Sequence, residues 1–261
     1  MILKQIKINI ENYPAELRPL LTGANLYDSS CSEAARVIFI DKDGGLFLKC
    51  AAKGALEREA AMTRYFYTKG LSVNVLAYIS DESDWLLTSK IPGNDCTTAK
   101  YLEQPERLCD IFAEQLAILH GIDFKDCPVP NHTELILAKA ERNKRGGNYD
   151  KSQFPDNWGY KSEEEAWQIV ETHSHLLKTD TLLHGDYCLP NIILNDWNFS
   201  GFIDLGNGGV GDRHVDIFWA AWTLYWNLHT HNYRERFIDV YGRGKVDEDM
   251  LRVVAAVEVF G

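Results

Sequence analysis

The segment from Leu182 to Gly209 constrains the fold more than any other part of the chain. It reads LLHGDYCLPNIILNDWNFSGFIDLGNGG, and its short apolar runs each adjoin a polar residue, namely His184, Asp186, Asn191 or Asp204. Short apolar runs bounded by turn residues are typical of buried strands. A loop followed by a hairpin would bring the oxygen-bearing side chains of Asp186, Asn191 and Asp204 together.

The chemistry of these three side chains favours a site for phosphate groups. Carboxylate and carboxamide oxygens are hard ligands that suit Mg²⁺, an ion that usually also accepts oxygens of a substrate phosphate. If two of the three side chains hold the ion, Asp186 is free to take a proton from an attacking hydroxyl. The sequence therefore indicates a magnesium-dependent reaction of phosphates.

The remaining pattern predicts an α+β chain with two lobes. The 261 residues are 45% hydrophobic and 25% charged, which is enough for a large core. A strand-rich lobe is expected at residues 1–91 and a larger, mainly helical lobe at 92–261, with a hinge at 90–95. The expected strands are 36–41, 45–50, 75–79, 85–89, 192–194 and 200–205. The expected helices are 55–69, 105–122, 162–178 and 214–229.

The charge distribution bears on the partners of the protein. The net charge is −11; residues 1–91 carry 11 acidic and 11 basic side chains, so the whole surplus lies in residues 92–261. An acidic surface disfavours nucleic acid and attracts cationic ligands. No apolar run is long enough for a membrane span, and the first residues lack a signal-peptide pattern. We therefore expect a cytoplasmic protein with no membrane partner, whose six scattered cysteines are reduced thiols.

The motifs resemble those of a known family. HGDYCLPN and FIDLGNGG are similar to the H-G-D-x-x-x-x-N loop and the I-D-x-G segment of the aminoglycoside phosphotransferases, which are related to protein kinases. The resemblance implies a bilobal protein-kinase-like fold with a small antiparallel-sheet N-lobe, and a kinase that uses Mg²⁺ and ATP or GTP. It implies Asp186 as the catalytic base and Asn191 and Asp204 as Mg²⁺ ligands. His184 is implied to hold the loop, and Asp216 to anchor its backbone.

The resemblance also implies a lysine–glutamate pair in the first lobe. Lys49 ends the apolar run GLFLKC, and Glu59 follows ten residues later in the expected helix. In kinase-like folds such a lysine contacts the nucleotide phosphates and the glutamate orients it. Glu57 is the rival partner, but residues two apart lie on different faces of a helix, so only one of the two can face Lys49.

The other nucleotide contacts follow from position in the same pattern. Ser30 and Ser32 lie before the first hairpin, where the family has its phosphate-covering loop. Phe47, two residues before Lys49, resembles the adenine-stacking position. Ser89 and Ile91 resemble the ends of the hinge whose backbone meets the base edge.

The phosphoryl acceptor is inferred from a narrower likeness. The chain is similar over most of its length to the aminoglycoside 3′-phosphotransferases. This resemblance implies that Asp156 and Glu258 correspond to acidic residues that bind the polycationic drug in that subfamily. The expected reaction is therefore transfer of the γ-phosphate to the 3′-hydroxyl of an aminoglycoside, which would confer resistance. Asn207 and Val257 depart from the Arg and Asp that this subfamily has at those positions. Other cationic or hydroxylated small molecules therefore remain as acceptors, and a nucleotide-binding pseudokinase remains as an alternative.

One motif suggests a different function. GNGGVG at 206–211 matches the G-x-G-x-x-G pattern of dinucleotide-binding turns. It occurs too late in the chain for a full doubly wound sheet, and it also fits a loop after the metal-binding segment.

Overall fold

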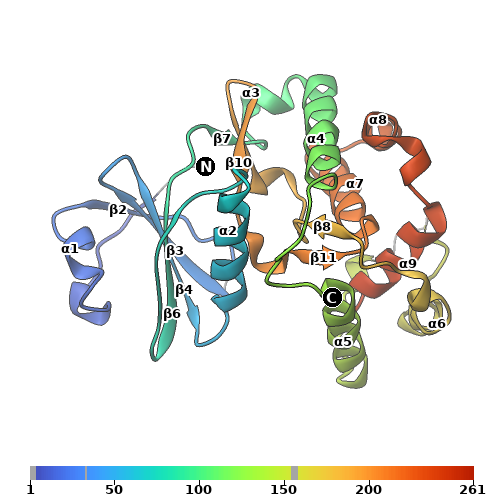
Figure 1. Cartoon of the computed structure of the whole chain (residues 1–261), viewed down its shortest axis with the longest axis horizontal. Coiled ribbons are helices and arrows are strands. Elements are labelled where there is room, and N and C mark those ends of the chain that lie inside the picture. Colours follow the sequence, from blue (N-terminus) through green and yellow to red (C-terminus); the bar gives the residue numbers. More distant parts are fainter. Residues whose placement is uncertain (1–3, 33, 154–157) are drawn as a thin grey trace. The chain divides into compact units, whose positions relative to one another are not determined.

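A computed structural model describes residues 4–32, 34–153 and 158–261, which form two compact units (Figure 1). The strand unit contains the described residues up to Asn94 together with Ile193–Gly206. The helical unit contains Asp95–Ile192 and Asn207–Gly261. The predicted α+β fold with an antiparallel sheet in its first part is confirmed.

The strand unit is built on a six-stranded antiparallel sheet with the order β1-β2-β3-β4-β6-β5. Its strands are β1 Lys4–Gln5, β2 Asn25–Asp28, β3 Ala35–Asp41, β4 Leu46–Ala52, β5 Val75–Ser80 and β6 Ser83–Ser89. Its helical segments are η1 Ile10–Asn12, α1 Arg18–Leu21 and α2 Glu57–Thr68. The turn between β3 and β4 places Asp43, Gly44 and Gly45 at positive φ, which Gly and Asp tolerate best.

The two faces of this sheet are covered by different parts of the strand unit. Ile38 and Ile40 of β3 and Leu48 of β4 are buried against the N-terminal segment. Leu86 of β6 is buried on the other face against Ala60 of α2, and Figure 1 shows α2 lying along the sheet. The alternation of side chains along each strand separates these two layers.

A hairpin from later in the sequence also belongs to the strand unit. Strands β9 Ile192–Asn195 and β10 Asn198–Phe202 form it, and β7 Asn94–Asp95 is the third strand of their sheet. The backbone N–H of Phe202 donates to the carbonyl of Leu71 over 2.8 Å, and Ser72 Oγ donates to the Phe202 carbonyl over 2.8 Å. These bonds group 193–206 with the strand unit, whereas the sequence assigns that segment to the larger lobe.

The helical unit consists mainly of helices around one short antiparallel strand pair. The helices are α3 Ala99–Leu102, α4 Pro105–Leu119, α5 His132–Arg145, α6 Glu163–His173, α7 His214–Leu228, α8 Asn232–Tyr241 and α9 Glu248–Glu258. The strands are β8 Thr181–Leu183 and β11 Gly209–Gly211. Short 3₁₀ turns are η2 Lys151–Gln153, η4 Ser174–Leu176, η5 Leu189–Asn191, η6 Leu205–Asn207, which crosses the unit boundary, and η7 Arg243–Lys245. Helices α5, α8 and α9 were not predicted from the sequence.

Large aromatic side chains fill the core of the helical unit. Phe112 of α4 packs against Tyr187 with ring centroids 4.6 Å apart, and against Phe237 of α8 at 5.8 Å. The Tyr187 hydroxyl donates to the Phe112 carbonyl over 2.8 Å. This packing fixes the loop before β9 to α4. No helix in the described ranges is long and apolar enough to cross a membrane.

Candidate active site

The strand unit contains a half-buried lysine held by two carboxylates. Lys49 Nζ lies 2.7 Å from Glu59 Oε2 and 2.8 Å from Asp204 Oδ1. Glu59 lies on the buried side of α2 with 8% of its surface exposed, whereas Glu57 is exposed. The geometry therefore decides between the two glutamates in favour of Glu59.

The surroundings keep Lys49 charged. Burial opposes the positive charge, but the carboxylates of Glu59 and Asp204 outweigh this effect and raise the pKa of Lys49 above its ordinary value. Asp204 adopts a left-handed backbone conformation with φ of 58°, which is uncommon for a residue other than glycine. Such strain persists where surrounding structure enforces it, and here it accompanies the ion pair with Lys49.

The two serines predicted to cover phosphates lie in the turn before β3. Ser30 donates its backbone N–H to Asp28 Oδ1, and its Oγ accepts the backbone N–H of Val37, both over 2.9 Å. Ser32 is exposed. Ser30 therefore stabilises the turn with its side chain, and its contact with a phosphate stays a prediction.

The remaining predicted nucleotide contacts lie on three neighbouring segments of the strand unit. Phe47 is half-buried and packs against Phe39, with ring centroids 5.1 Å apart. Ser89 ends β6 opposite Leu46. Ile91 is buried, and its side chain lies so close to Gly201 that a Cβ there would be 2.8 Å from Ile91 Cδ1. Ile91 is therefore tied to the hairpin that carries Asp204.

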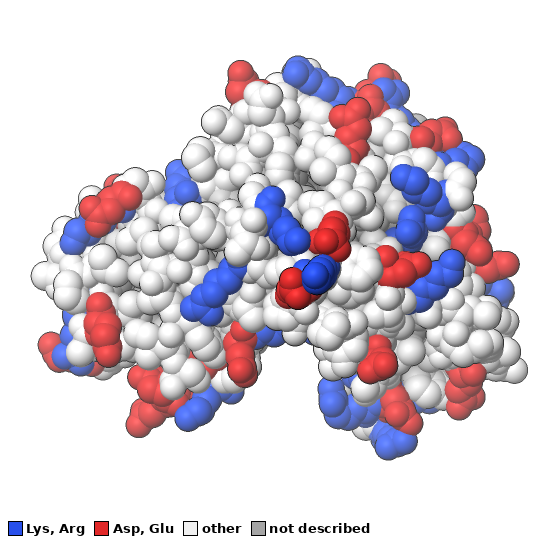
Figure 2. Space-filling model, in the orientation of Figure 1, with Lys and Arg blue, Asp and Glu red and all other residues white. Residues whose placement is uncertain are grey.

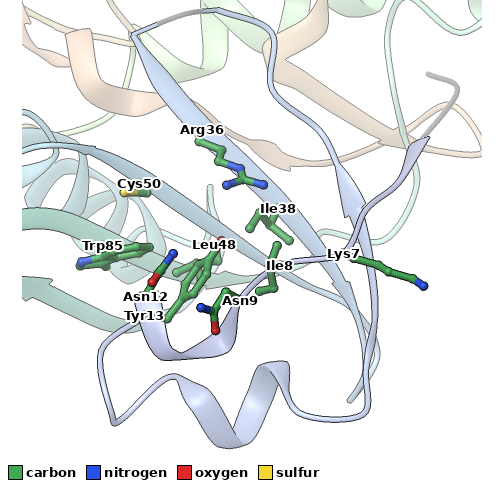
Figure 3. Close-up of a pocket in the computed structure, with 10 residues that line it drawn as sticks. All are labelled: Lys7, Ile8, Asn9, Asn12, Tyr13, Arg36, Ile38, Leu48, Cys50 and Trp85. Atoms are coloured by element: carbon green, nitrogen blue, oxygen red, sulfur yellow. The ribbon is translucent and has the colours of Figure 1, made fainter.

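A separate cavity lies on the other face of the same sheet. It has a volume of about 280 Å³ and lies between the N-terminal segment and strands β3, β4 and β6 (Figure 3). Leu48 and Cys50 line it, and because side chains alternate along a strand, Lys49 points to the opposite face. The guanidinium of Arg36 is turned toward the cavity, whereas the ammonium group of Lys7 points away from it. This cavity is therefore not part of the Lys49 site.

The helical unit holds the second group of predicted residues. Asn191 Nδ2 donates to Asp186 Oδ2 over 2.9 Å and to the Asp186 carbonyl over 3.0 Å. Because the amide nitrogen faces Asp186, the Oδ1 atom of Asn191 points away from it. The loop is thus closed on itself by a contact between residues five apart.

The side chain of Asp216 holds the backbone of this loop in place, as predicted. Its carboxylate accepts the backbone N–H groups of His184 over 2.8 Å and of Gly185 over 2.7 Å. Burial raises the pKa of Asp216, but hydrogen bonds from His120 and from the loop outweigh it, so the pKa is held below its ordinary value. His184 Nδ1 lies 3.3 Å from the backbone nitrogen of Asp186, which fits the structural role assigned to His184.

A third partner of Asp216 was missed in the sequence. His120 Nε2 lies 3.1 Å from Asp216 Oδ2, and its Nδ1 lies 2.8 Å from the Tyr241 hydroxyl. Burial lowers the pKa of His120, so the ring is neutral and donates its Nε2–H to the carboxylate. The signal was a lone polar residue at the end of the apolar helical pattern of 105–122, which is a weak indication by itself.

The predicted acceptor contacts have different outcomes. Asp156 lies outside the described residues. Glu258 ends α9 and is half-buried; burial of its carboxylate raises its pKa to about 7, with Lys139 opposing and Asp186 reinforcing the shift. The side chain of Trp219 in α7 acts on the Glu258 carboxylate and lowers its pKa. Glu258 therefore lies within electrostatic reach of Asp186, which the sequence alone did not show.

The dinucleotide reading of GNGGVG is wrong. Residues Gly209–Gly211 form β11, which pairs antiparallel with β8, and no helix start receives the glycines as a dinucleotide turn requires. A Cβ on Gly209 would lie 2.8 Å from Val129 Cγ1, and one on Gly211 would lie 2.8 Å from His132 Nδ1. The glycines are needed for close packing inside the helical unit.

The chain was compared with protein families and with known proteins. A model of the phosphotransferase enzyme family matches residues 29–255. A probable aminoglycoside 3′-phosphotransferase of Lactococcus lactis subsp. lactis (strain IL1403) is 50% identical over 260 residues, which cover 99% of both chains.

Solved structures with similar folds were also found. The crystal structure of an aminoglycoside-3′-phosphotransferase of type VIII has a TM-score of 0.76 at 24% identity and covers 96% of each chain. The aminoglycoside phosphotransferase APH(3″)-Id from Streptomyces rimosus, in complex with ADP and streptomycin, has a TM-score of 0.70 at 22% identity. That match covers 86% of this chain and 90% of the other. At these identities the structural likeness shows the fold.

Proposed function

The chain belongs to the phosphotransferase enzyme family, and from this premise we propose that it transfers the γ-phosphate of ATP to a hydroxyl of an aminoglycoside. The 50% identity to a probable aminoglycoside 3′-phosphotransferase along the whole chain supports the 3′-hydroxyl as the position modified. The structural observation that carries the proposal is the ion-paired Lys49 with Glu59 and Asp204 at 2.7 and 2.8 Å. GTP is the alternative phosphate donor.

The strand unit is proposed to hold the nucleotide. Lys49 is kept positively charged by its two carboxylates, and a fixed ammonium group can neutralise the α- and β-phosphates. Glu59 keeps this group in place because it is itself held on the buried side of α2. Phe47 lies on the same face of β4 as Lys49 and is proposed to pack against the adenine. The backbone at Ser89 and Ile91 is proposed to meet the base edge.

The helical unit is proposed to activate the acceptor. Asp186 takes the proton of the attacking hydroxyl as the new bond forms between that oxygen and the γ-phosphorus. The bond between the γ-phosphorus and the bridging oxygen breaks, and ADP leaves with the electron pair. Asn191 and the anchor at Asp216 fix the position of Asp186, because phosphoryl transfer depends mostly on positioning and on charge neutralisation.

The chemistry of two side chains suits a magnesium ion. Asn191 offers a carboxamide oxygen and Asp204 a carboxylate, and both are hard ligands. We propose that Asn191 and Asp204 hold Mg²⁺. When bound, Mg²⁺ would neutralise charge on the phosphate oxygens.

A polycationic acceptor agrees with the charge of the protein. On the face shown in Figure 2, however, acidic and basic side chains are mixed and form no continuous patch of one sign. The surplus of acidic residues therefore gives only a long-range attraction for cations. Direct contacts with the ammonium groups of the acceptor must come from individual carboxylates. Glu258 is proposed as one of them, because the charge of Asp186 acts on its carboxylate, and Asp156 stays a prediction from the sequence. Since the reaction consumes ATP, we propose that the enzyme acts in the cytoplasm.

Release of ADP, measured by a coupled assay over a panel of aminoglycosides, choline-like amines and neutral sugars, tests the function. We expect aminoglycoside-dependent ADP release by the wild type. The Asp186→Ala variant should lose at least a thousandfold in kcat and still show a thermal shift with MgATP. The control is Asp180→Ala, which removes an exposed aspartate of the same unit and should leave kcat unchanged. If only the amines or the sugars stimulate ADP release, the acceptor is not an aminoglycoside but belongs to that class. Binding of MgATP without any turnover would identify a pseudokinase.

The biological consequence has its own test. Expression of the wild-type chain in a sensitive bacterium should raise the inhibitory concentration of the phosphorylated aminoglycoside. Expression of Asp186→Ala to the same level should not raise it. Equal protection by both chains would contradict resistance through phosphorylation.

A further inference from the structure

Three indole rings form a ladder on one side of α7. Trp219, Trp222 and Trp226 are three and four residues apart, so they lie on the same side of the helix. The centroids of Trp219 and Trp222 are 5.6 Å apart with the rings nearly perpendicular. Those of Trp222 and Trp226 are 5.4 Å apart with an interplanar angle of only 8°. We call these three residues the tryptophan ladder.

The ladder is not simply part of the hydrophobic core. Trp226 exposes 61% of its surface, and Trp219 and Trp222 are half-buried. Exposing indole rings to water costs free energy in proportion to their apolar area. Contacts between neighbouring rings lower that cost only in part. Exposed apolar patches of this kind commonly bind a ligand or a partner.

The inner end of the ladder reaches the acceptor side of the proposed active site. The Trp219 side chain lowers the pKa of the Glu258 carboxylate, and the charge of Asp186 raises it. All of these residues belong to the helical unit. The ladder therefore runs from the exposed Trp226 to the half-buried Trp219, whose side chain acts on the Glu258 carboxylate.

We propose that the tryptophan ladder is the surface on which amino-sugar rings of the acceptor stack, with Glu258 pairing with an ammonium group at its inner end. This inference rests on the proposed function, since it names how that site recognises its acceptor. An amino sugar has an apolar C–H face that packs on an indole, and its ammonium groups are attracted to the negative face of the ring. The pKa of Glu258, raised to about 7, would fall as an ammonium group arrives, so cation binding stabilises the charged carboxylate.

The test compares variants of the ladder with a neighbour outside it. Trp226→Ala and Trp222→Ala should each raise the KM for kanamycin by about tenfold and leave the KM for ATP unchanged. Trp222→Phe keeps a ring and should recover part of the loss. The control is Tyr225→Ala, because Tyr225 lies on the same helix with 44% exposure but stacks on His231 instead, with centroids 4.1 Å apart.

The outcomes separate the ladder from the function. If both Trp→Ala variants keep a wild-type KM for kanamycin while the wild type turns it over, the ladder proposal is wrong and the kinase stands. If the wild type phosphorylates no aminoglycoside, the function is wrong, and titration calorimetry with kanamycin still decides the ladder: weaker binding by Trp226→Ala supports it and equal binding refutes it. If Trp222→Ala fails to fold, Trp226→Ala still decides, because its ring is mostly exposed and contributes little to stability.

Discussion

Replacement of Asp216 by asparagine tests how the helical unit positions the catalytic loop. The wild-type carboxylate is fully buried, is ionised because its pKa is lowered, and accepts N–H groups from His184, Gly185 and His120. Asparagine keeps the volume but offers only one acceptor oxygen. If that oxygen faces His184 and His120, the NH₂ group faces the N–H of Gly185. The Gly185 N–H then loses its acceptor, and the new NH₂ group is a second buried donor facing a donor.

The expected loss follows from these contacts. A hydrogen bond to a charged group contributes about 1.5–3 kcal/mol, and a buried donor without a partner costs about 1–3 kcal/mol. We expect Asp216→Asn to lower the free energy of unfolding by about 3 kcal/mol in urea titrations. The displaced loop also moves Asp186, and because a shift of about 1 Å can cost about a hundredfold in rate, we expect kcat to fall by about that factor.

A second buried aspartate provides the matched control. Asp212 accepts the backbone N–H groups of Lys178 and His214 over 2.7 and 2.9 Å, but it makes no bond to the loop at 184–191. Asp212→Asn should therefore cost similar stability and change kcat by less than about threefold. The reasoning is refuted if Asp216→Asn is destabilised like Asp212→Asn but keeps a kcat within twofold of the wild type.

Three further changes have defined outcomes. Glu59→Gln should raise the KM for ATP about tenfold in steady-state assays, because Lys49 loses a charged partner, whereas the exposed Glu57→Gln should not; equal effects of the two would contradict the pairing. Glu258 has a pKa raised from 4.5 to about 7, so the native state favours its protonated form and the wild type loses stability as pH rises through this range. Thermal melts of Glu258→Gln should therefore show its stability relative to the wild type increasing between about pH 5 and 8, and a constant difference would argue against the shift. Gly185→Ala would place a Cβ in steric overlap with the carbonyl oxygen of Asn207 at a φ of 81°, so we expect a lower melting temperature and a large loss of kcat. Wild-type values for both would show that the loop has room to move.

Some long-range features were predicted from the sequence only through a resemblance. Lys49 and Asp204 form an ion pair although they are 155 residues apart. Neither the periodicity of apolar residues nor the spacing of motifs predicts such a pair. Only the resemblance to the family's motifs assigned both residues to a nucleotide site. The structure shows the ion pair, and the contacts of these residues with nucleotide and metal stay proposals.

The sequence by itself determined the features that depend on neighbouring residues. Two short apolar runs rich in β-branched or aromatic residues, with the turn residues DKDG at 41–44 between them, predicted the hairpin of β3 and β4. The spacing of five residues placed Asn191 beside Asp186 on one loop. Helix-forming residues predicted α2, and the helical spacing of apolar residues predicted α4, because burial of one face repeats every three to four residues.

Only the tertiary structure decided which distant groups meet. It selected Glu59 over Glu57 as the partner of Lys49, and it grouped 193–206 with the strand unit. It also added His120 as a partner of Asp216 and brought the Trp219 side chain to act on the Glu258 carboxylate. Each of these contacts joins two segments that are far apart in the chain, and the local sequence pattern of either segment is compatible with many packing partners. The choice among those partners is made by the packing of a whole unit, in which every buried polar group must find an acceptor or a donor at once.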